Sequence, residues 1–285
     1  KRDDMNVEEI MSKDIIVGYV PGTVEDALTI LSKNDVSGIP VLKKGTDIIK
    51  GVVTRSDIFK NAEEDQLAMV MNEEYSSVKP KDTIDKAAKL LFEQRIHGLP
   101  VVNSKKQLVG IISPKEILKV LIQKQRDEPV ESHISTHVVP VYKETPVNIV
   151  MEIIKITNEN ALPVLDENRK VIGIVSDGDI FKLSQIKEEI EESNMGIGDD
   201  EDQWTWEGIR DTVRMYHSTS EVSLPMEPVE KVMVKNVKTA TKRTPICDVA
   251  KMMVKHDISH IPLVNSENRL VGMVTDIDLM DCIGD

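Results

Sequence analysis

A hydroxyl and a carboxylate three residues apart occur four times in this 285-residue chain, each time after a Gly and two apolar residues. The pairs are Thr54 and Asp57, Ser113 and Glu116, Ser176 and Asp179, and Thr275 and Asp278. An apolar run before such a pair predicts a strand that leads into a helix. Both side chains then face one cleft, and the backbone N–H groups of the helix start can bind sugar or phosphate oxygens. For a single copy taken alone, a capping box that only satisfies the first helical turn is the simpler interpretation.

Two further features keep register with the four pairs. A Pro lies ten or eleven residues before each Gly, and a small apolar residue lies 13 before each Pro: Ala27, Ala87, Val150 and Val249. Such self-similarity predicts a repeat architecture. The four acids are 59, 63 and 99 residues apart, so the last interval holds an insertion of roughly 40 residues. The predicted repeats are residues 6–62, 66–124, 129–185 and 228–285, with an insertion at 186–227.

Each repeat predicts the order strand, helix, strand, strand, helix, which makes the chain an α/β protein. A leading apolar segment closed by Met or Ile comes first, as in Val7 to Met11. Thr145 and Thr244 each precede a Pro and are expected to cap a helix that begins at that Pro, and Asp82 is expected to cap the helix of the second repeat. The two later strands are continuously apolar, which indicates cover on both faces. Because a unit of about 60 residues is marginal alone, the repeats are expected to pair through their sheets.

Composition excludes several classes of protein. The chain carries 36 Lys and Arg against 49 Asp and Glu, and the insertion alone holds a net charge of −9 of the total −13. The sequence lacks a stripe of Lys and Arg, so nucleic acid is not expected as a partner, because neutralisation of phosphates supplies most of the affinity of nucleic-acid-binding proteins. No apolar run approaches the ~18 residues of a membrane span, and the first residues do not resemble a signal peptide, so a cytoplasmic protein is expected. Cys247 and Cys282 are expected to be buried thiols.

The element order, the apolar-Pro-Val strand and the Gly-to-acid ending together resemble cystathionine β-synthase (CBS) domains. Four copies in two tandem pairs resemble the regulatory gamma subunit of AMP-activated protein kinase and stand-alone archaeal relatives. The resemblance implies two Bateman modules, which bind adenosine-containing ligands such as AMP, ADP, ATP, S-adenosylmethionine or methylthioadenosine between paired repeats. It implies a regulatory, energy-sensing protein that signals to a protein partner or forms a homodimer and needs no cofactor. The alternative is an oligomerisation scaffold whose ligand sites have decayed.

In the family, the hydroxyl and acid of one repeat face a base pocket of the partner repeat, and this implies four residue sets. The first two sets are Ser176 and Asp179 with Thr244, Val249, Ile258 and Ser259, and Thr54 and Asp57 with Asp82, Ala87, Ile96 and His97. The third is Thr275 and Asp278 with Thr145, Val150, Glu159 and Asn160, where Glu159 puts a charge beside the base. The last is Ser113 and Glu116 with Gly22, Ala27, Val36 and Ser37, in which the acid is one methylene longer. Thr145 and Thr244 keep their alternative role as helix caps.

Basic residues near these sets are few: His97, His260, Arg55 and Lys115. Asp177 and Asp276 add negative charge between hydroxyl and acid. A triphosphate needs several cationic partners. The sequence therefore favours AMP, S-adenosylmethionine or methylthioadenosine over ATP.

The insertion contains an acidic stretch, expected to be a solvated loop, and both tryptophans of the chain, Trp204 and Trp206, with Tyr216 close by. A disordered linker rarely contains such residues, so they are expected to pack onto the body of the protein or to contact a partner or a second copy. No motif indicates an enzyme, because the sequence has no metal cluster, no nucleophile with a base and no phosphate-cradling glycine loop. His133 and His137, four apart, would make only a weak metal pair, and no metal is expected.

Overall fold

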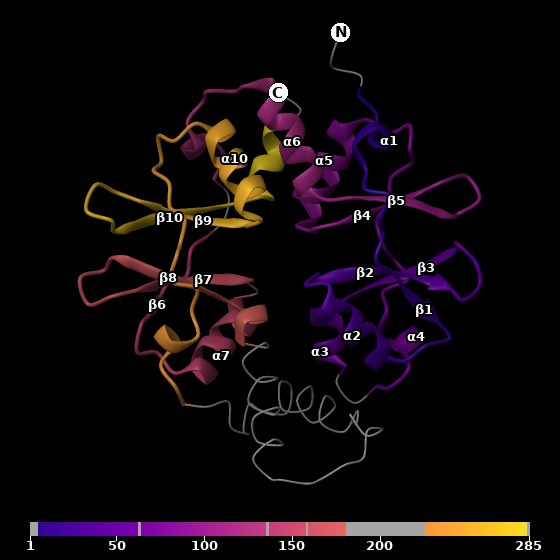
Figure 1. Cartoon of the computed structure of the whole chain (residues 1–285), viewed down its shortest axis with the longest axis horizontal. Helices are drawn as coiled ribbons and strands as arrows, with labels where there is room; N and C mark the ends of the chain where they lie inside the picture. The colour runs from indigo at the N-terminus through magenta and orange to yellow at the C-terminus, as the bar shows by residue number, and fades with distance from the viewer. Residues whose placement is uncertain (1–4, 62–63, 135–136, 158, 181–225, 284–285) are drawn as a thin grey trace. The chain divides into compact units, whose positions relative to one another are not determined.

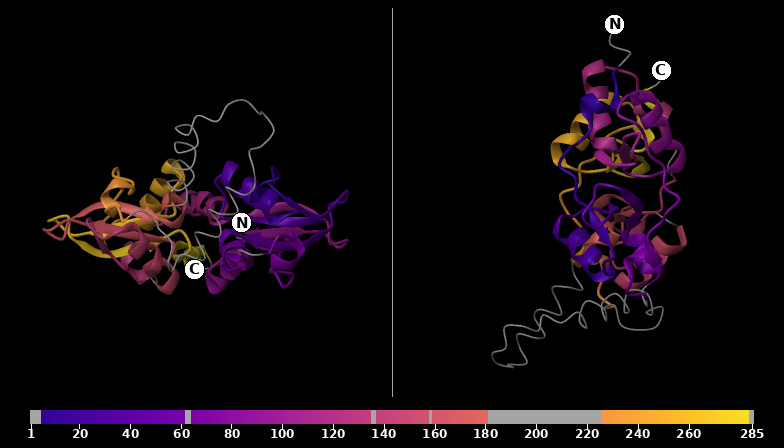
Figure 2. Two further views of the ribbon diagram at one scale, coloured as in Figure 1. Left: turned by 90° about the horizontal axis from the view of Figure 1, so that it is seen from below. Right: turned by 90° about the vertical axis from the view of Figure 1, so that its right-hand side faces the viewer.

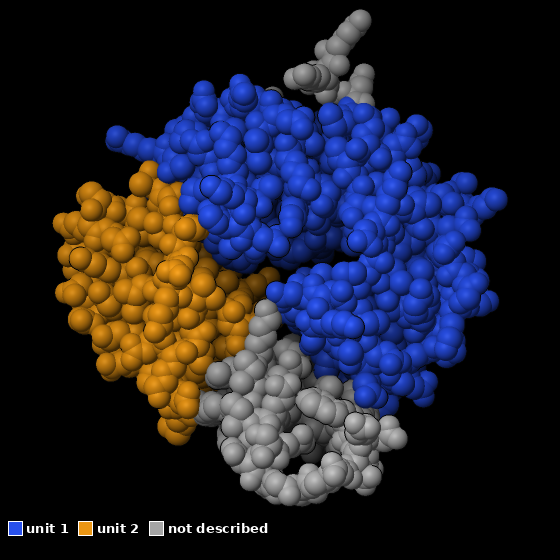
Figure 3. All heavy atoms as spheres, in the orientation of Figure 1, with its two compact units in different colours: residues 1–136, 242–261, 274–285 blue, residues 137–241, 262–273 orange. Residues whose placement is uncertain are grey.

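The computed structural model describes residues 5–61, 64–134, 137–157, 159–180 and 226–283, so nearly all of the insertion lies outside the described residues. The chain divides into two compact units, which Figure 3 colours separately. Unit 1 comprises residues 1–136, 242–261 and 274–285, and unit 2 comprises 137–241 and 262–273. Repeats 1 and 2 lie wholly in unit 1, whereas repeats 3 and 4 contribute to both.

Repeat 1 has the predicted order of elements (Figure 1). After the short helix α1 (Val7–Ile10) come β1 (Gly18–Val20), α2 (Val24–Lys33), β2 (Gly38–Lys43), β3 (Ile49–Thr54) and α3 (Arg55–Lys60). Strand β2 is central, since it pairs in parallel with β1 and antiparallel with β3. The apolar stripe of α2, which includes Ala27 and Leu28, is buried, as its helical spacing predicts.

The other repeats are variations on this order. Repeat 2 contains α4 (Leu67–Val70), α5 (Ile84–Gln94), β4 (Leu99–Val102), β5 (Leu108–Ile112) and α6 (Pro114–Lys124). Repeat 3 contains η1 (Val130–His133), β6 (Val141–Tyr142), α7 (Val147–Thr157), β7 (Ala161–Leu165) and β8 (Val171–Ser176). Repeat 4 contains η2 (Val229–Lys231), α10 (Ile246–His256), β9 (His260–Val264), β10 (Leu270–Thr275) and η3 (Asp278–Ile283). In repeats 2 and 4 a single parallel bridge replaces the first strand, and repeat 4 ends in a 3₁₀ helix instead of the predicted α-helix.

Cover on both faces was expected for both later strands, and the structure shows it only for the first of each pair. In β2 four consecutive residues, Ile39 to Leu42, are buried, whereas β3 alternates between buried and partly exposed positions. Strands β7 and β8 of unit 2 repeat this contrast. The difference follows from sheet order, because β2 and β7 are central strands while β3 and β8 lie at the edge. Figure 2 shows helices on both sides of the strands of repeats 1 and 2.

The repeats pair reciprocally through their leading segments. In unit 1 the Val7 amide donates to the Asp82 carbonyl (2.9 Å) at the start of α5, and the Val24 amide of α2 donates to the Asp65 carbonyl (2.9 Å) before α4. Each leading segment therefore lies at the start of the partner repeat's helix. The sheets also meet, because Leu42 and Ile49 of repeat 1 share a hydrophobic cluster with Leu108 of repeat 2. Pairing through the sheets is thus confirmed for these two repeats.

The same exchange joins repeats 3 and 4 within each unit. In unit 1 the Val130 amide donates to the Thr244 carbonyl (2.9 Å). In unit 2 the Val229 amide donates to the Thr145 carbonyl (2.9 Å), and the Val147 amide donates to the Glu227 carbonyl (3.0 Å). The leading segment of repeat 4 therefore lies at the start of α7, as the leading segments of unit 1 lie at the starts of their partner helices.

The predicted helix caps were wrong by one residue. Thr83, not Asp82, caps α5, since its hydroxyl accepts from the Lys86 amide (3.3 Å). Helices α7 and α10 begin at Val147 and Ile246, one residue after the Pro that was expected to be their first residue. Thr145 and Thr244 consequently lie outside the cap position, where their carbonyls accept from the leading segments of the partner repeats.

The Gly of the repeated pattern has a packing role. A Cβ added at Gly51 would lie 2.7 Å from the Asn72 carbonyl oxygen, because the leading segment of repeat 2 crosses β3 at that point. At Gly110 and Gly173 the crossing residue is Met11 or Met233, the Met that closes a leading segment. The edge strands are thereby covered, which removes an exposed ladder of backbone groups.

Cys247 and Cys282 are buried free thiols, as expected. Among the described residues, no helix has the length and apolar character that crossing a membrane requires.

Candidate ligand-binding site

The junction of β3 and α3 holds the hydroxyl–carboxylate pair of repeat 1. Thr54 ends the strand in an extended conformation (φ −116°, ψ 164°) and is the N-cap of α3. Its backbone amide and its hydroxyl both donate to Asp57 Oδ2, at 2.9 and 2.6 Å, and the Asp57 amide donates to Thr54 Oγ1 at 3.2 Å. The capping box considered for this spacing is therefore formed.

The cap uses only one of the two carboxylate oxygens of Asp57. Within the described chain, Asp57 Oδ1 accepts no hydrogen bond, and the residue is partly exposed. A carboxylate that is fixed through one oxygen and open at the other is well placed to accept from a hydroxyl of a bound molecule, since it has about four lone-pair sites. The capping and ligand interpretations of the pair are thus compatible.

The other three copies have the same local geometry. The Ser113 amide donates to Glu116 Oε2 (2.9 Å), the Ser176 hydroxyl to Asp179 Oδ2 (2.6 Å) and the Thr275 amide to Asp278 Oδ2 (2.9 Å). Glu116 and Asp179 are partly exposed, like Asp57.

The copy in repeat 4 differs in burial. Asp278 is 0 % exposed and Thr275 is 3 % exposed, and η3, which begins at Asp278, packs against α5 and α6 within unit 1. The sequence already argued against ligand binding at this site, because Glu159 would put a charge beside the base. Burial of Asp278 is a second argument against binding, and the sequence did not reveal it. In this conformation the Asp278 carboxylate offers no surface to a ligand.

The base-pocket residues expected to face Thr54 and Asp57 lie in the same unit. Ile96 and His97 connect α5 to β4 after Arg95, which ends the helix in the left-handed conformation (φ 50°). Both are partly buried. No hydrogen bond or ion pair joins Ile96 or His97 to Thr54 or Asp57 in the described part of the chain, so the two halves of this predicted site are not bonded to each other.

The remaining members of that set have structural partners. Ala87 is fully buried in α5. The Asp82 carboxylate accepts from the Lys79 amide (2.8 Å) and from Lys86 Nζ (2.9 Å). Asp82 is therefore engaged in fixing the start of α5.

Two of the predicted sites draw residues from both compact units and remain predictions. Unit 2 holds Ser176, Asp179, Thr145, Val150, Glu159 and Asn160, and unit 1 holds Thr244, Val249, Ile258, Ser259, Thr275 and Asp278. Val249 and Val150 are buried helix residues, Asn160 is exposed, and Ile258 and Ser259 are partly buried.

Three of the four basic residues named as phosphate candidates face a carboxylate, and burial disfavours the charged form of the fourth, His260. His97 Nδ1 lies 3.6 Å from Asp276 Oδ1, Lys115 Nζ lies 2.7 Å from Asp257 Oδ1, and Arg55 Nη2 lies 3.5 Å from Asp35 Oδ1. Burial lowers the pKa of His260, which favours its neutral form. Sequence reasoning missed the pairing of His97 with Asp276, because no local pattern links a residue of repeat 2 to one of repeat 4.

This pairing predicts a pH dependence with a definite sign. Burial lowers the pKa of His97, but the hydrogen bond and charge of Asp276 raise it by more, against a smaller opposing effect of Arg95, so the pKa lies above its ordinary value of 6.5. The stabilisation by His97 is therefore full below pH 6.5 and is lost as pH rises through the folded-state pKa. We expect the difference in free energy of unfolding between wild type and His97→Gln, measured in urea, to be largest below pH 6.5 and to shrink as the pH rises above that value.

His260→Gln is the matched control for this prediction. Because burial lowers the pKa of His260, the wild type loses stability relative to this variant as pH falls below 6.5, which is the opposite direction. A His97→Gln difference that stays constant or grows with pH would show that the ion pair with Asp276 does not form.

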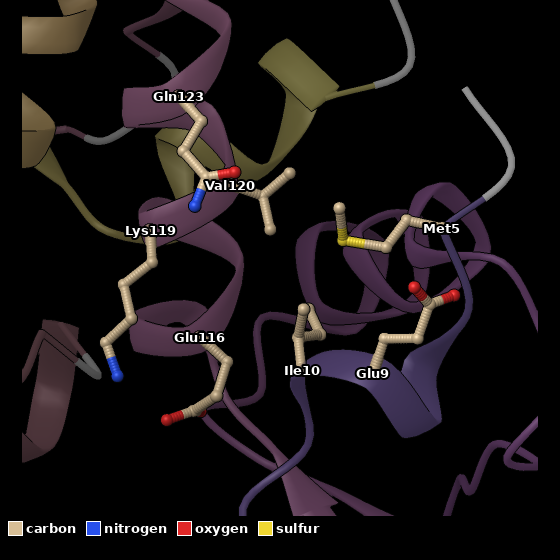
Figure 4. Close-up of a pocket in the computed structure, with 7 residues that line it drawn as sticks. All are labelled: Met5, Glu9, Ile10, Glu116, Lys119, Val120 and Gln123. Atoms are coloured by element: carbon tan, nitrogen blue, oxygen red, sulfur yellow. The ribbon is translucent and has the colours of Figure 1, made fainter. Parts of the chain in front are cut away.

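A pocket of about 330 Å³ lies between α1 and α6 in unit 1 (Figure 4). Its lining comprises Met5, Glu9, Ile10, Glu116, Lys119, Val120 and Gln123. It contains the acid of repeat 2 but none of the residues expected to face that acid. The Glu9 carboxylate accepts from the Asn6 amide (2.9 Å) and Glu116 from Ser113, so both carboxylates stabilise the helices that form the pocket. No group of three or more potential metal ligands occurs among the residues that the structure describes.

Four sheet-and-helix repeats that exchange their leading segments, each with a capped acid at a helix start, define a repeat protein of paired modules. The CBS domain model matches residues 7–64, 67–123, 130–185 and 229–285, so the chain belongs to the CBS domain family. The resemblance drawn from the repeated motif is thereby confirmed.

Two relatives of similar length match nearly the whole chain. An uncharacterized protein of Methanocaldococcus jannaschii, MJ1225, is 23 % identical over 293 residues, covering 94 % of this chain and 95 % of its own. Its crystal structure, described as that of a candidate archaeal homologue of the AMPK gamma subunit, superposes with a TM-score of 0.77 at 22 % identity, covering 98 % of this chain and 99 % of its own. A conserved protein of Pyrococcus horikoshii gives a TM-score of 0.68 at 24 % identity, with 98 % and 100 % covered. These likenesses establish the fold.

CBS domains also occur as parts of larger proteins. A homoserine O-acetyltransferase of Methanohalobium evestigatum is 33 % identical over 114 residues, which is 40 % of this chain and 23 % of the enzyme. The chain thus spans nearly all of MJ1225 but only about a quarter of the acetyltransferase.

Proposed function

We propose that the chain is a regulatory sensor that binds an adenosine compound of low negative charge, such as AMP, S-adenosylmethionine or methylthioadenosine, and signals to a protein partner. In this proposal Thr54 and Asp57 bind the ribose of the ligand, and Ile96 and His97 lie beside its base. Asp57 supports this role because one carboxylate oxygen is fixed by the cap and the other is open. A ribose supplies the paired hydroxyl donors that such an oxygen accepts.

The pairing and charge of the basic residues favour a ligand of low negative charge over a triphosphate. His97, Lys115 and Arg55 each pair with a carboxylate, and His260 favours its neutral form. A triphosphate would have to displace these carboxylates to gain cationic partners, which costs the existing pairs. The buried Nε of Arg55, beside Thr54, has no hydrogen-bond partner among the described residues, so one donor remains for a single phosphate or a ribose oxygen.

Signalling to a partner requires that the ligand change the arrangement of the repeats, and the four CBS matches supply the repeats that can pair around a ligand. A ligand that binds between paired repeats stabilises one arrangement of them, and a partner that distinguishes the arrangements responds to the ligand.

A thermal-shift screen of the full chain tests this function. AMP, S-adenosylmethionine or methylthioadenosine at a hundred times its Kd should stabilise the protein by about 2.7 kcal/mol, which raises Tm by roughly 5–10 °C, whereas ATP should act only at higher concentration. An unchanged Tm with every adenosine compound up to millimolar concentration would instead support a scaffold with decayed sites. A larger shift with ATP than with AMP would refute the proposed ligand class.

A further inference from the structure

The outer face of helix α7 in unit 2 is apolar. Its inner stripe, Val147, Val150, Met151 and Ile154, is buried. On the other side Ile149 is 48 % exposed and Ile156 is 75 % exposed, with the half-buried Ile153 between them. Positions 149, 153 and 156 follow the spacing of a single helical stripe, so these side chains form one surface.

The other repeats show that this surface is unusual. Aligned from the first residue of each helix, the position of Ile149 is Asp26 in α2, Lys86 in α5 and Asp248 in α10. The position of Ile156 is Lys33, Glu93 and Lys255 in the same three helices. All six of these residues are charged and exposed. The fold itself therefore does not require an apolar residue at either place.

A third position shows the same change. Met226 lies three residues before η2 and is 80 % exposed. The corresponding residues before the other leading segments are acids: Asp4, Glu64 and Asp127. Met226 is next to Glu227, whose carbonyl accepts from the first amide of α7, so it adjoins the start of the same helix. We call Met226, Ile149, Ile153 and Ile156 the α7 surface.

The chain itself supplies a segment that fits this surface. Met226 is the first described residue after 181–225, so that segment joins unit 2 directly at the α7 surface. Within it, Trp204, Trp206, Ile209, Val213 and Tyr216 gather in 13 residues, and the last four are three or four residues apart, which is the spacing of one helical face. The ten residues from Tyr216 to Met226 reach at most about 36 Å, about twice the ~16 Å length of an eleven-residue helix.

We infer that residues 204–216 dock on the α7 surface and cover it. Removing exposed isoleucine and tryptophan side chains from water drives the contact, which is the usual reason for a large apolar patch on a protein surface. The contact ties the insertion to repeat 3, the repeat after which it is inserted. The occupant is a segment of the same chain, not a second copy or another protein.

Tryptophan fluorescence tests the contact without added probes, because Trp204 and Trp206 are the only tryptophans of the chain. We expect blue-shifted emission and weak acrylamide quenching for the full chain, at every protein concentration. The variant Ile149→Glu/Ile156→Glu should shift the emission to the red and raise the quenching constant severalfold. The matched control Lys33→Glu places the same residue at the equivalent position of α2 and should leave both signals unchanged.

Two further measurements show whether the double variant is folded and whether the segment protects α7. Circular dichroism should show the double variant folded, since both isoleucines are exposed; if it does not fold, Ile149→Ser/Ile156→Ser replaces it without adding charge. Replacing residues 200–218 by a Gly-Ser segment of equal length should increase hydrogen exchange in α7 but not in α2. Tryptophans that are fully exposed in the wild type, or buried but insensitive to the α7 variants, would overturn the inference. So would burial that appears only at concentrations where sedimentation shows a dimer.

Discussion

Replacing Asp57 with Ala should weaken binding of the adenosine ligand by about 10- to 100-fold. The variant removes the carboxylate oxygen that is open to a ribose hydroxyl, and a hydrogen bond to a charged group contributes about 1.5–3 kcal/mol. The same substitution also removes the cap of α3, which should lower the free energy of unfolding by about 1 kcal/mol. Calorimetric titration measures the first effect and urea denaturation the second.

Glu116→Ala separates the two effects. It removes an equivalent capping box in α6, because Glu116 accepts from the Ser113 amide as Asp57 accepts from Thr54. We therefore expect a similar loss of stability. Ligand affinity at the Thr54–Asp57 site should be unchanged, because Glu116 belongs to a separate residue set. If both variants lowered the affinity equally, the effect of Asp57 would be one of stability, and its role in binding would be refuted.

Replacing Gly51 with Ala should destabilise the protein by about 1–3 kcal/mol. The new Cβ would lie 2.7 Å from the Asn72 carbonyl oxygen, and backbone cannot move aside as a flexible side chain can. The hydrogen bonds between Val52 and Asn72, at 3.0 and 2.8 Å, hold the two segments together, so the clash strains the contact that pairs repeats 1 and 2. Urea denaturation of the full chain measures the change.

Gly272→Ala is the internal control for Gly51. Its Cβ would lie 3.6 Å from Leu263 Cδ1, which is an ordinary contact and the nearest one within the described part of the chain. The substitution should therefore be neutral or stabilise by about 0.4–1 kcal/mol through the unfolded state. Equal destabilisation by both variants would mean that the glycines serve the strands themselves and not the crossing segments.

The repeats and their order of elements were predictable because the governing interactions are local. Helix α2 shows its buried stripe in the spacing of Ala27, Leu28 and Leu31, and the Thr54–Asp57 cap lies within four residues. The exchange of leading segments was harder to predict from the sequence. Helices α7 and α10 begin one residue later than predicted, after Pro146 and Pro245, and the carbonyls of the preceding threonines accept hydrogen bonds from a segment far away in the chain.

The parts of the site that depend on distant residues could not be predicted. No pattern within one repeat indicates that Asp276 pairs with His97 or that η3 packs against α5 and buries Asp278. The last repeat carries the same Thr-to-Asp motif as the first, yet its acid is enclosed while Asp57 is partly exposed. Equal motifs therefore gave equal caps but unequal access for a ligand.

A crystal structure of the full chain grown with the tightest-binding adenosine compound would show directly whether the Thr54–Asp57 junction binds the ribose. We expect a ribose hydroxyl within about 3.2 Å of the Asp57 carboxylate, with the Thr54–Asp57 cap intact and the base beside Ile96 and His97. A ligand bound elsewhere while this junction stays empty, or a triphosphate that displaces Asp276 from His97, would contradict it.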